Sequence, residues 1–145
     1  MLRKIIYVGL LAPVLFIACQ NKKGPDNSNY YSTPTGVKEL HTVYFDYDQA
    51  LIQDSQADVL IGNSTVLKAN SSWRVTAEGH CDERGTNEYN MALGDRRARS
   101  TKDYLINLGV DPAKLSTMSY GEERPTCYEH DESCWSRNRR AEFVK

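Results

Sequence analysis

Strand-like and helix-like segments alternate through residues 37–145, and this alternation constrains the fold more than any other feature of the chain. The longest helix pattern runs from Asn87 to Leu108, and Gly109 followed by Pro112 marks its end. Two neighbouring rows of this segment repeat every seven residues: Met91, Ala98, Leu105 and Gly94, Thr101, Leu108. The repeat predicts a helix with one face packed against a core.

Shorter segments complete the pattern. Strands are predicted at 42–45, 73–78, 115–120 and 141–144, where β-branched, aromatic or alternating residues gather. A first helix is expected after Ser55, which with Asp58 resembles an N-cap, and its apolar face consists of Ala57, Leu60, Ile61 and Leu67. The segment 126–135 is expected to be irregular. The order β-α-β-α-β-β predicts an α+β fold, a mixed sheet with helices packed on it.

The first 18 residues do not fit this domain. Arg3 and Lys4 precede an apolar run from 5 to 16, and the small residue Ala18 stands before Cys19. This order is typical of a secretory signal peptide. A membrane-anchoring helix is the alternative, but a membrane span needs about 20 apolar residues.

Cys19 makes the leader more specific. Residues 15–19, Leu-Phe-Ile-Ala-Cys, resemble the lipobox of bacterial lipoproteins, with Phe16 where leucine is usual. That resemblance implies a lipidated Cys19 as the first mature residue. Gln20 is not the aspartate that keeps many such lipoproteins at the inner membrane, so the outer membrane is the expected location, with the domain facing the periplasm.

Residues 19–36 are expected to form a flexible tether, because they are polar and rich in Asn, Ser, Pro and Gly. Such a chain has a typical reach of only about 20–25 Å. Without residues 1–18 the chain keeps 16 basic and 19 acidic residues, a formal charge of −3. This balance argues against nucleic acid as a partner.

The segment 78–98 carries the chemistry. It is predicted to be a strand end, a loop that turns at Gly85, and the start of the long helix. Asn90, Leu93 and Arg97 share one helix face, and a loop folded over that face would bring Asp82 and Arg97 into one pocket. A carboxylate and a guanidinium together suit a zwitterion, since one binds an ammonium group and the other a carboxylate.

Each of these residues also has an ordinary structural interpretation. Asp82 and Arg97 could form a surface ion pair worth about 0–1 kcal/mol. Arg96, Arg97 and Arg99 could be a solvated helix face. His80 is expected to be a hydrogen-bonded structural residue rather than a ligand or a base.

Five separated segments, taken together, resemble the OmpA-like domain family: Phe45-Asp46-Tyr47-Asp48, residues 79–85, residues 93–98, Ser119-Tyr120-Gly121 and Asn138-Arg139-Arg140. Within that family the resemblance is strongest to the peptidoglycan-associated lipoproteins, and it runs from about Val43 to the C-terminus. It implies non-covalent binding of the cell wall, which would tether the outer membrane to peptidoglycan. Further implied partners are the Tol proteins, including a TolB-like periplasmic propeller that competes for an overlapping surface.

The resemblance also implies site residues. The positions matching Asp82 and Arg97 hold the ammonium and the carboxylate of diaminopimelate in the peptidoglycan stem peptide. The other implied positions are Tyr47, Asp48, Thr86, Asn90 and Leu93, which line the site, and Asn138 and Arg139, which close it nearby. Which diamino acid the wall carries is left open, as is the oligomeric state.

Three further cysteines follow Cys19, and an exported protein meets oxidising conditions. We expect a disulfide between Cys127 and Cys134, which would leave Cys81 buried or reactive. The alternative is a zinc site of Cys127, His130 and Cys134, with Cys81, His80 or Asp82 as a fourth ligand. Its spacing matches no common structural zinc pattern, so no metal and no cofactor is expected.

A hydrolase acting on the wall is the alternative function. Carboxylates for such chemistry are available at Asp46, Asp48, Asp82 and Glu83. However, no nucleophile stands with a base and an orienting partner in a recognisable arrangement. A nearby arginine would also keep Asp82 ionised, which suits ammonium binding better than general acid catalysis. We therefore expect a binding protein rather than an enzyme.

Overall fold

The computed structural model describes residues 39–145, which lie within one compact unit. The elements are β1 (Val43–Tyr44), α1 (Asp54–Ala69), β2 (Val75–His80), α2 (Asn87–Asn107), the 3₁₀ turn η2 (Pro112–Lys114), β3 (Leu115–Gly121), α3 (Glu132–Asn138) and β4 (Arg140–Val144). The predicted signal peptide, the lipidated Cys19 and the tether lie outside the described residues. Among the helices from residue 39 onward, none has both the length and the apolar character that crossing a membrane requires.

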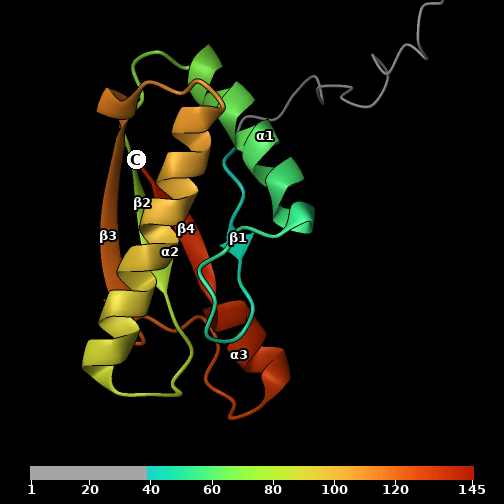
Figure 1. Cartoon of the computed structure of the whole chain (residues 1–145), viewed down its shortest axis with the longest axis vertical. Coiled ribbons are helices and arrows are strands. Elements are labelled where there is room, and N and C mark those ends of the chain that lie inside the picture. Colours follow the sequence, from blue (N-terminus) through green and yellow to red (C-terminus); the bar gives the residue numbers. More distant parts are fainter. Residues whose placement is uncertain (1–38) are drawn as a thin grey trace, which may run out of the picture. The chain divides into compact units, whose positions relative to one another are not determined.

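The four strands form one mixed sheet in the order β1-β4-β2-β3. β2 and β3 are parallel, as expected for strands joined by a helix, whereas β4 is antiparallel to both β1 and β2. Figure 1 shows α2 lying along the sheet, with α1 beside it. The predicted α+β class, a mixed sheet with helices packed on it, is confirmed.

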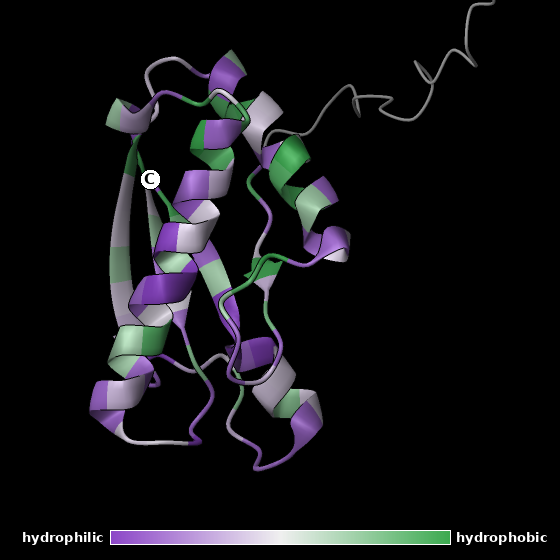
Figure 2. Ribbon diagram, in the orientation of Figure 1, coloured by the Kyte–Doolittle hydropathy of each residue, from purple (hydrophilic) through white to green (hydrophobic). Residues whose placement is uncertain are grey.

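The core lies between the sheet and the two long helices. Its buried members are apolar residues from every layer: Val43, Phe45, Leu60, Leu67, Val75, Leu105, Val110, Leu115 and Ala141. Of the predicted face of α2, Gly94, Ala98, Thr101 and Leu105 are buried, whereas Met91 and Leu108 are partly buried. The loops at the lower end of the view in Figure 2 are mostly hydrophilic, and the candidate site lies among them.

Two glycines let α2 approach β2 closely. A Cβ atom on Gly79 would lie 1.9 Å from the carbonyl oxygen of Gly94, a distance that no real contact shows. A Cβ atom on Gly94 would in turn lie 2.4 Å from the hydroxyl of Ser119 on β3. Because the backbones touch at this point, the first turns of α2 lie directly over the end of β2.

Two local predictions were wrong. The segment 126–135 is irregular only as far as Asp131, because α3 begins there: the Asp131 carboxylate accepts a hydrogen bond from the Cys134 amide at 3.1 Å. The first helix begins at Asp54 rather than after a Ser55 cap, and its N-cap residue, Gln53, makes no side-chain cap hydrogen bond. The end of α2 is as predicted, with Gly109 in a left-handed conformation at φ 86°.

Candidate functional site

A cavity of about 170 Å³ lies where the end of β2, the start of α2 and the turn at 46–49 meet. It is lined by Tyr47, Asp48, Cys81, Asp82, Arg84, Gly85, Tyr89, Asn90, Leu93 and Arg97. Six of the nine predicted site residues are in this lining: Tyr47, Asp48, Asp82, Asn90, Leu93 and Arg97. Four of the lining side chains are charged, two of each sign, so the cavity is polar without favouring one charge.

Arg97 is fully buried, with 0% of its surface exposed. Its guanidinium donates to three backbone carbonyls, those of Gln49 at 2.8 Å, His80 at 2.7 Å and Asp46 at 3.0 Å. A further Nη1 contact reaches the sulfur of Cys81 at 3.5 Å, which leaves one N–H on Nη2 without a partner among residues 39–145. Burial lowers the pKa of Arg97 below its usual value, although an arginine still carries its proton at neutral pH.

From residue 39 onward, no carboxylate pairs with Arg97. The interpretation of Asp82 and Arg97 as a surface ion pair is therefore wrong on both counts, since both side chains are buried and they bond to other groups. Arg96 and Arg99 are exposed, so the solvated-face interpretation holds for them but not for Arg97. A buried cation without a carboxylate partner is the unusual feature of this site.

Asp82 is 3% exposed and has all its acceptor positions filled. Its Oδ1 accepts from the amide and the Nε of Arg84 at 3.0 and 3.1 Å, and its Oδ2 accepts from Nη2 of Arg84 at 2.7 Å. Arg139 donates to Oδ2 at 3.3 Å. Burial alone would raise the pKa of Asp82, but the hydrogen bonds from Arg84 and Arg139 outweigh burial and hold that pKa below its ordinary value.

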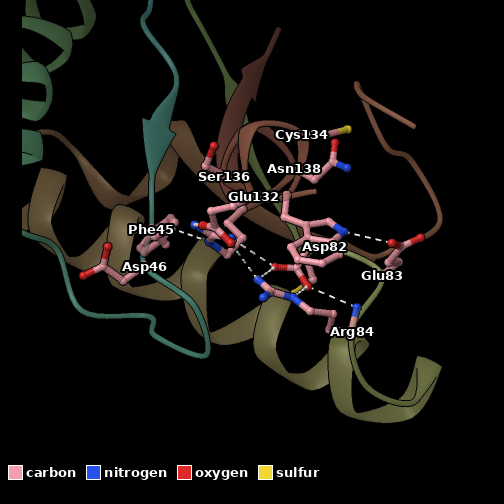
Figure 3. A network of polar contacts seen from close by, with 12 residues as sticks. Phe45, Asp46, Asp82, Glu83, Arg84, Glu132, Cys134, Ser136 and Asn138 are labelled. Atoms are coloured by element: carbon pink, nitrogen blue, oxygen red, sulfur yellow. Dashed lines mark hydrogen bonds and ion pairs between the residues drawn. The ribbon is translucent and has the colours of Figure 1, made fainter. Parts of the chain in front are cut away.

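Arg84 is the main site residue that sequence reasoning missed. In Figure 3 dashed lines join it to Asp82. Its guanidinium carbon lies 4.0 Å from the ring centroid of Tyr47 and 4.1 Å from that of Trp135, so the group makes cation–π contacts with two aromatic rings. The spacing of Asp82 and Arg84 in a tight loop was visible in the sequence, but the two rings come from distant segments.

The turn before Gln49 has a strained residue at the cavity. Asp48 has φ 56°, a left-handed conformation that side-chain-bearing residues rarely adopt, and its carboxylate accepts a hydrogen bond from the Tyr89 hydroxyl. The side-chain amide of Asn90 donates to the Asp82 carbonyl at 3.2 Å and to the Glu122 carboxylate at 2.6 Å. These contacts attach the turn and the loop to α2.

Three predicted site residues lie beside the cavity rather than in its lining. Thr86 is the N-cap of α2, and its hydroxyl accepts from the Tyr89 amide at 3.2 Å. Asn138 accepts from the amides of Thr126 and Cys127 and so fixes the preceding loop. Arg139 reaches the site indirectly, because it donates to both Asp82 and the Phe45 carbonyl.

The predicted disulfide between Cys127 and Cys134 is present. The two cysteines of the alternative zinc site are thus joined in the disulfide, and its His130 bonds to Glu83, with Nδ1 2.6 Å from Oε1. Cys81 is the free and buried cysteine of the described residues. Burial raises the pKa of the Cys81 thiol to about 11.

His80 differs from expectation. It is 1% exposed, and neither ring nitrogen has a hydrogen-bond partner among the described residues. The imidazole instead stacks on Tyr120, with ring centroids 5.6 Å apart. Burial, followed by the nearby charge of Arg140, lowers the pKa of His80 to about 4, so the ring is neutral at neutral pH.

Comparison with known proteins agrees with this fold. Residues 44–139 match the model of the OmpA family, and the chain belongs to that family. The peptidoglycan-associated lipoprotein of Pseudomonas aeruginosa is 46% identical over 114 residues, covering 79% of this chain and 67% of that protein. That of Pasteurella multocida is 40% identical over 144 residues, covering 97% and 95%. The resemblance to peptidoglycan-associated lipoproteins is thus confirmed, and the names of these relatives describe no enzymatic activity.

Solved structures lead to the same class. The crystal structure of the peptidoglycan-associated lipoprotein from Burkholderia pseudomallei is 41% identical, covers 71% of this chain and 87% of that chain, and has a TM-score of 0.69. The C-terminal domain of Helicobacter pylori MotB is 19% identical with a TM-score of 0.68, over 73% of this chain and 84% of that chain. At that identity the second likeness concerns the fold alone.

Proposed function

We propose that the protein binds peptidoglycan non-covalently and thereby attaches the outer membrane to the cell wall. One observation carries the proposal. The buried side chains of Asp82 and Arg97 line the same cavity, and Arg97 has no carboxylate partner among residues 39–145. A ligand carboxylate would supply that partner. The names of the relatives, which associate those proteins with peptidoglycan, support this choice of ligand.

The ligand group we infer is the zwitterionic end of diaminopimelate in a stem peptide. This end has an ammonium and a carboxylate on one carbon, so it presents both charges within the span of a small cavity. The carboxylate would accept from the free Nη2–H of Arg97, and the ammonium would bind at Asp82. Because three donors of Arg97 already hold backbone carbonyls, the guanidinium is fixed in place before the ligand arrives.

The attachment to the membrane is inferred from the first 36 residues of the sequence. We propose that Cys19 is lipidated after removal of residues 1–18 and that the lipid inserts into the outer membrane. Each buried CH₂ of a lipid contributes about 0.8 kcal/mol, so several acyl chains on one cysteine would hold the protein firmly. Replacing Cys19 with serine should move the protein from the membrane fraction to the soluble periplasmic fraction.

We infer the partnership with the Tol proteins from the family resemblance. In this proposal a TolB-like propeller binds a surface that overlaps the wall site, so the two ligands exclude each other. A soluble stem peptide should then displace the purified propeller from the immobilised protein. Simultaneous binding of both would contradict the overlap.

Wall binding is tested by pull-down of the detergent-purified full chain with intact peptidoglycan sacculi. Asp82→Asn and Arg97→Lys should each reduce the bound fraction strongly, because the first removes the charge that would bind the ammonium and the second removes the guanidinium N–H that would bind the carboxylate. Arg96→Lys is the matched control, since Arg96 is the exposed neighbour of Arg97 on the same helix. Wild-type binding by both site variants, with thermal melts that show folded protein, would refute the site.

A further inference from the structure

The carboxylate of Asp82 is already occupied. A carboxylate has about four acceptor positions, and all four of those on Asp82 accept hydrogen bonds. Three of the four donors belong to Arg84. Its backbone amide and its Nε donate to Oδ1, and its Nη2 donates to Oδ2. An incoming ammonium group therefore finds a cation in the position that it needs.

Arg84 is held there by more than Asp82. Its guanidinium carbon lies over the rings of both Tyr47 and Trp135, at 4.0 and 4.1 Å from their centroids. The Trp135 ring is itself fixed, because its indole N–H donates to the Glu83 carboxylate at 2.8 Å. The arginine side chain nevertheless keeps 28% of its surface exposed, so it can leave without unpacking the core.

A second acceptor lies within reach of the displaced group. The Oε2 of Glu132, at the start of α3, is 3.5 Å from Nη2 of Arg84. Glu132 also binds Arg139, through its other oxygen at 2.5 Å. A small rotation of Arg84 towards Glu132 would thus exchange one carboxylate for another and free the two acceptor positions on Asp82 that the Arg84 side chain fills.

We propose that Arg84 is an internal substitute for the ligand's ammonium group and that binding requires its displacement from Asp82. This inference rests on the proposed function. An amine alone replaces one cation by another at Asp82 and gains little. A zwitterion also brings a carboxylate to Arg97, and that second contact supplies the net affinity. Because a ligand must displace Arg84, simple amines bind too weakly to fill the site.

The test uses calorimetry on the full chain with two stem tripeptides, one with meso-diaminopimelate and one with lysine, which lacks only the second carboxylate. Arg84→Gln should tighten the binding of both peptides by a similar factor, about tenfold, because the displacement cost is common to both. Arg84→Lys keeps the charge but loses the two parallel donors of the guanidinium. Its affinity for each peptide should lie between those of wild type and Arg84→Gln. Thermal melts check that each variant is folded.

A spectroscopic measurement reports the displacement itself. In a Trp73→Phe background Trp135 is the remaining tryptophan of the chain, and its emission should change when the diaminopimelate peptide removes the cation from its ring. The same titration of Arg84→Gln should leave the emission nearly unchanged although the peptide binds.

The outcomes separate the two proposals. If Arg97→Lys weakens peptide binding but Arg84→Gln weakens it as well, or leaves it unchanged, the displacement is wrong and the wall site stands. If the diaminopimelate peptide binds neither wild type nor Arg84→Gln, the proposed function fails and this inference fails with it.

Discussion

Asp82 and Arg97 lie in the lining of one cavity, yet each is bonded to other groups and not to its counterpart. The guanidinium of Arg97 binds the backbone carbonyls of the turn at 46–49 and of the β2 end, while Asp82 binds Arg84 and Arg139. If the two charges neutralised each other, a zwitterion would gain nothing by entering. Their separation is what makes the site suitable for a ligand with both charges.

Arg97 supports the fold as well as the site, so its replacement is expected to cost stability. Arg97→Lys keeps the charge but serves fewer of the three carbonyls, and a buried polar group without a partner costs about 1–3 kcal/mol. The free energy of unfolding, measured by urea denaturation, should fall by about 2–4 kcal/mol. The matched variant Arg96→Lys should stay within about 0.5 kcal/mol of wild type. Equal stability of the two variants would contradict the buried hydrogen bonds.

The disulfide between Cys127 and Cys134 should stabilise the domain. It closes a short loop that ends in the first turn of α3, and the chain-entropy model gives about 2–3 kcal/mol for a loop of this size. Reduction, or Cys127→Ser together with Cys134→Ser, should lower the urea midpoint accordingly. Since Trp135 follows Cys134 directly, the Trp135 emission should also shift. An unchanged midpoint under reductant would show that the bridge contributes nothing.

His80 should make stability fall in mild acid. Its pKa is about 4 in the folded chain, lowered by burial, against 6.5 in the unfolded chain. Between these values the unfolded state binds more protons, so the stabilising contribution is present above pH 6.5 and is lost as the pH falls towards 4. The loss should reach about 2–3 kcal/mol. His80→Phe keeps the stack on Tyr120 without titrating, so its unfolding free energy should vary less over this range; parallel pH curves would refute the assignment.

Cys81 should be inert while the domain is folded. Its thiol is 3% exposed and donates to the Asn90 carbonyl at 3.3 Å, and its raised pKa leaves almost no thiolate at neutral pH. Ellman's reagent should therefore label Cys81 only after denaturant is added. Rapid labelling of the native protein would show that the end of β2 opens.

The predictable parts of the molecule were those with local signals. The α2 segment was predicted within one residue, because its seven-residue repeat ends at Leu108 and Gly109 comes next. The shared cavity of Asp82 and Arg97 was predicted from the loop and the helix that carry them. The helix α3 was missed because it is short and depends on the Asp131 cap. Arg84 was missed because its surroundings come from residues far apart in sequence. Long-range contacts of this kind leave no periodic pattern in the sequence from which they could be predicted.

The central claim is that the cavity holds a zwitterion at Arg97. The most direct measurement is an NMR titration of the full chain with a diaminopimelate-containing stem peptide, following the side-chain Nε–H resonance of Arg97 and the backbone amides from residue 80 to residue 97. We predict saturable shifts of the Arg97 resonance together with those of the Asp82 loop, and little change at the exposed side chain of Arg96. Shifts confined to other surfaces, with the Arg97 resonance unmoved at saturation, would contradict the claim.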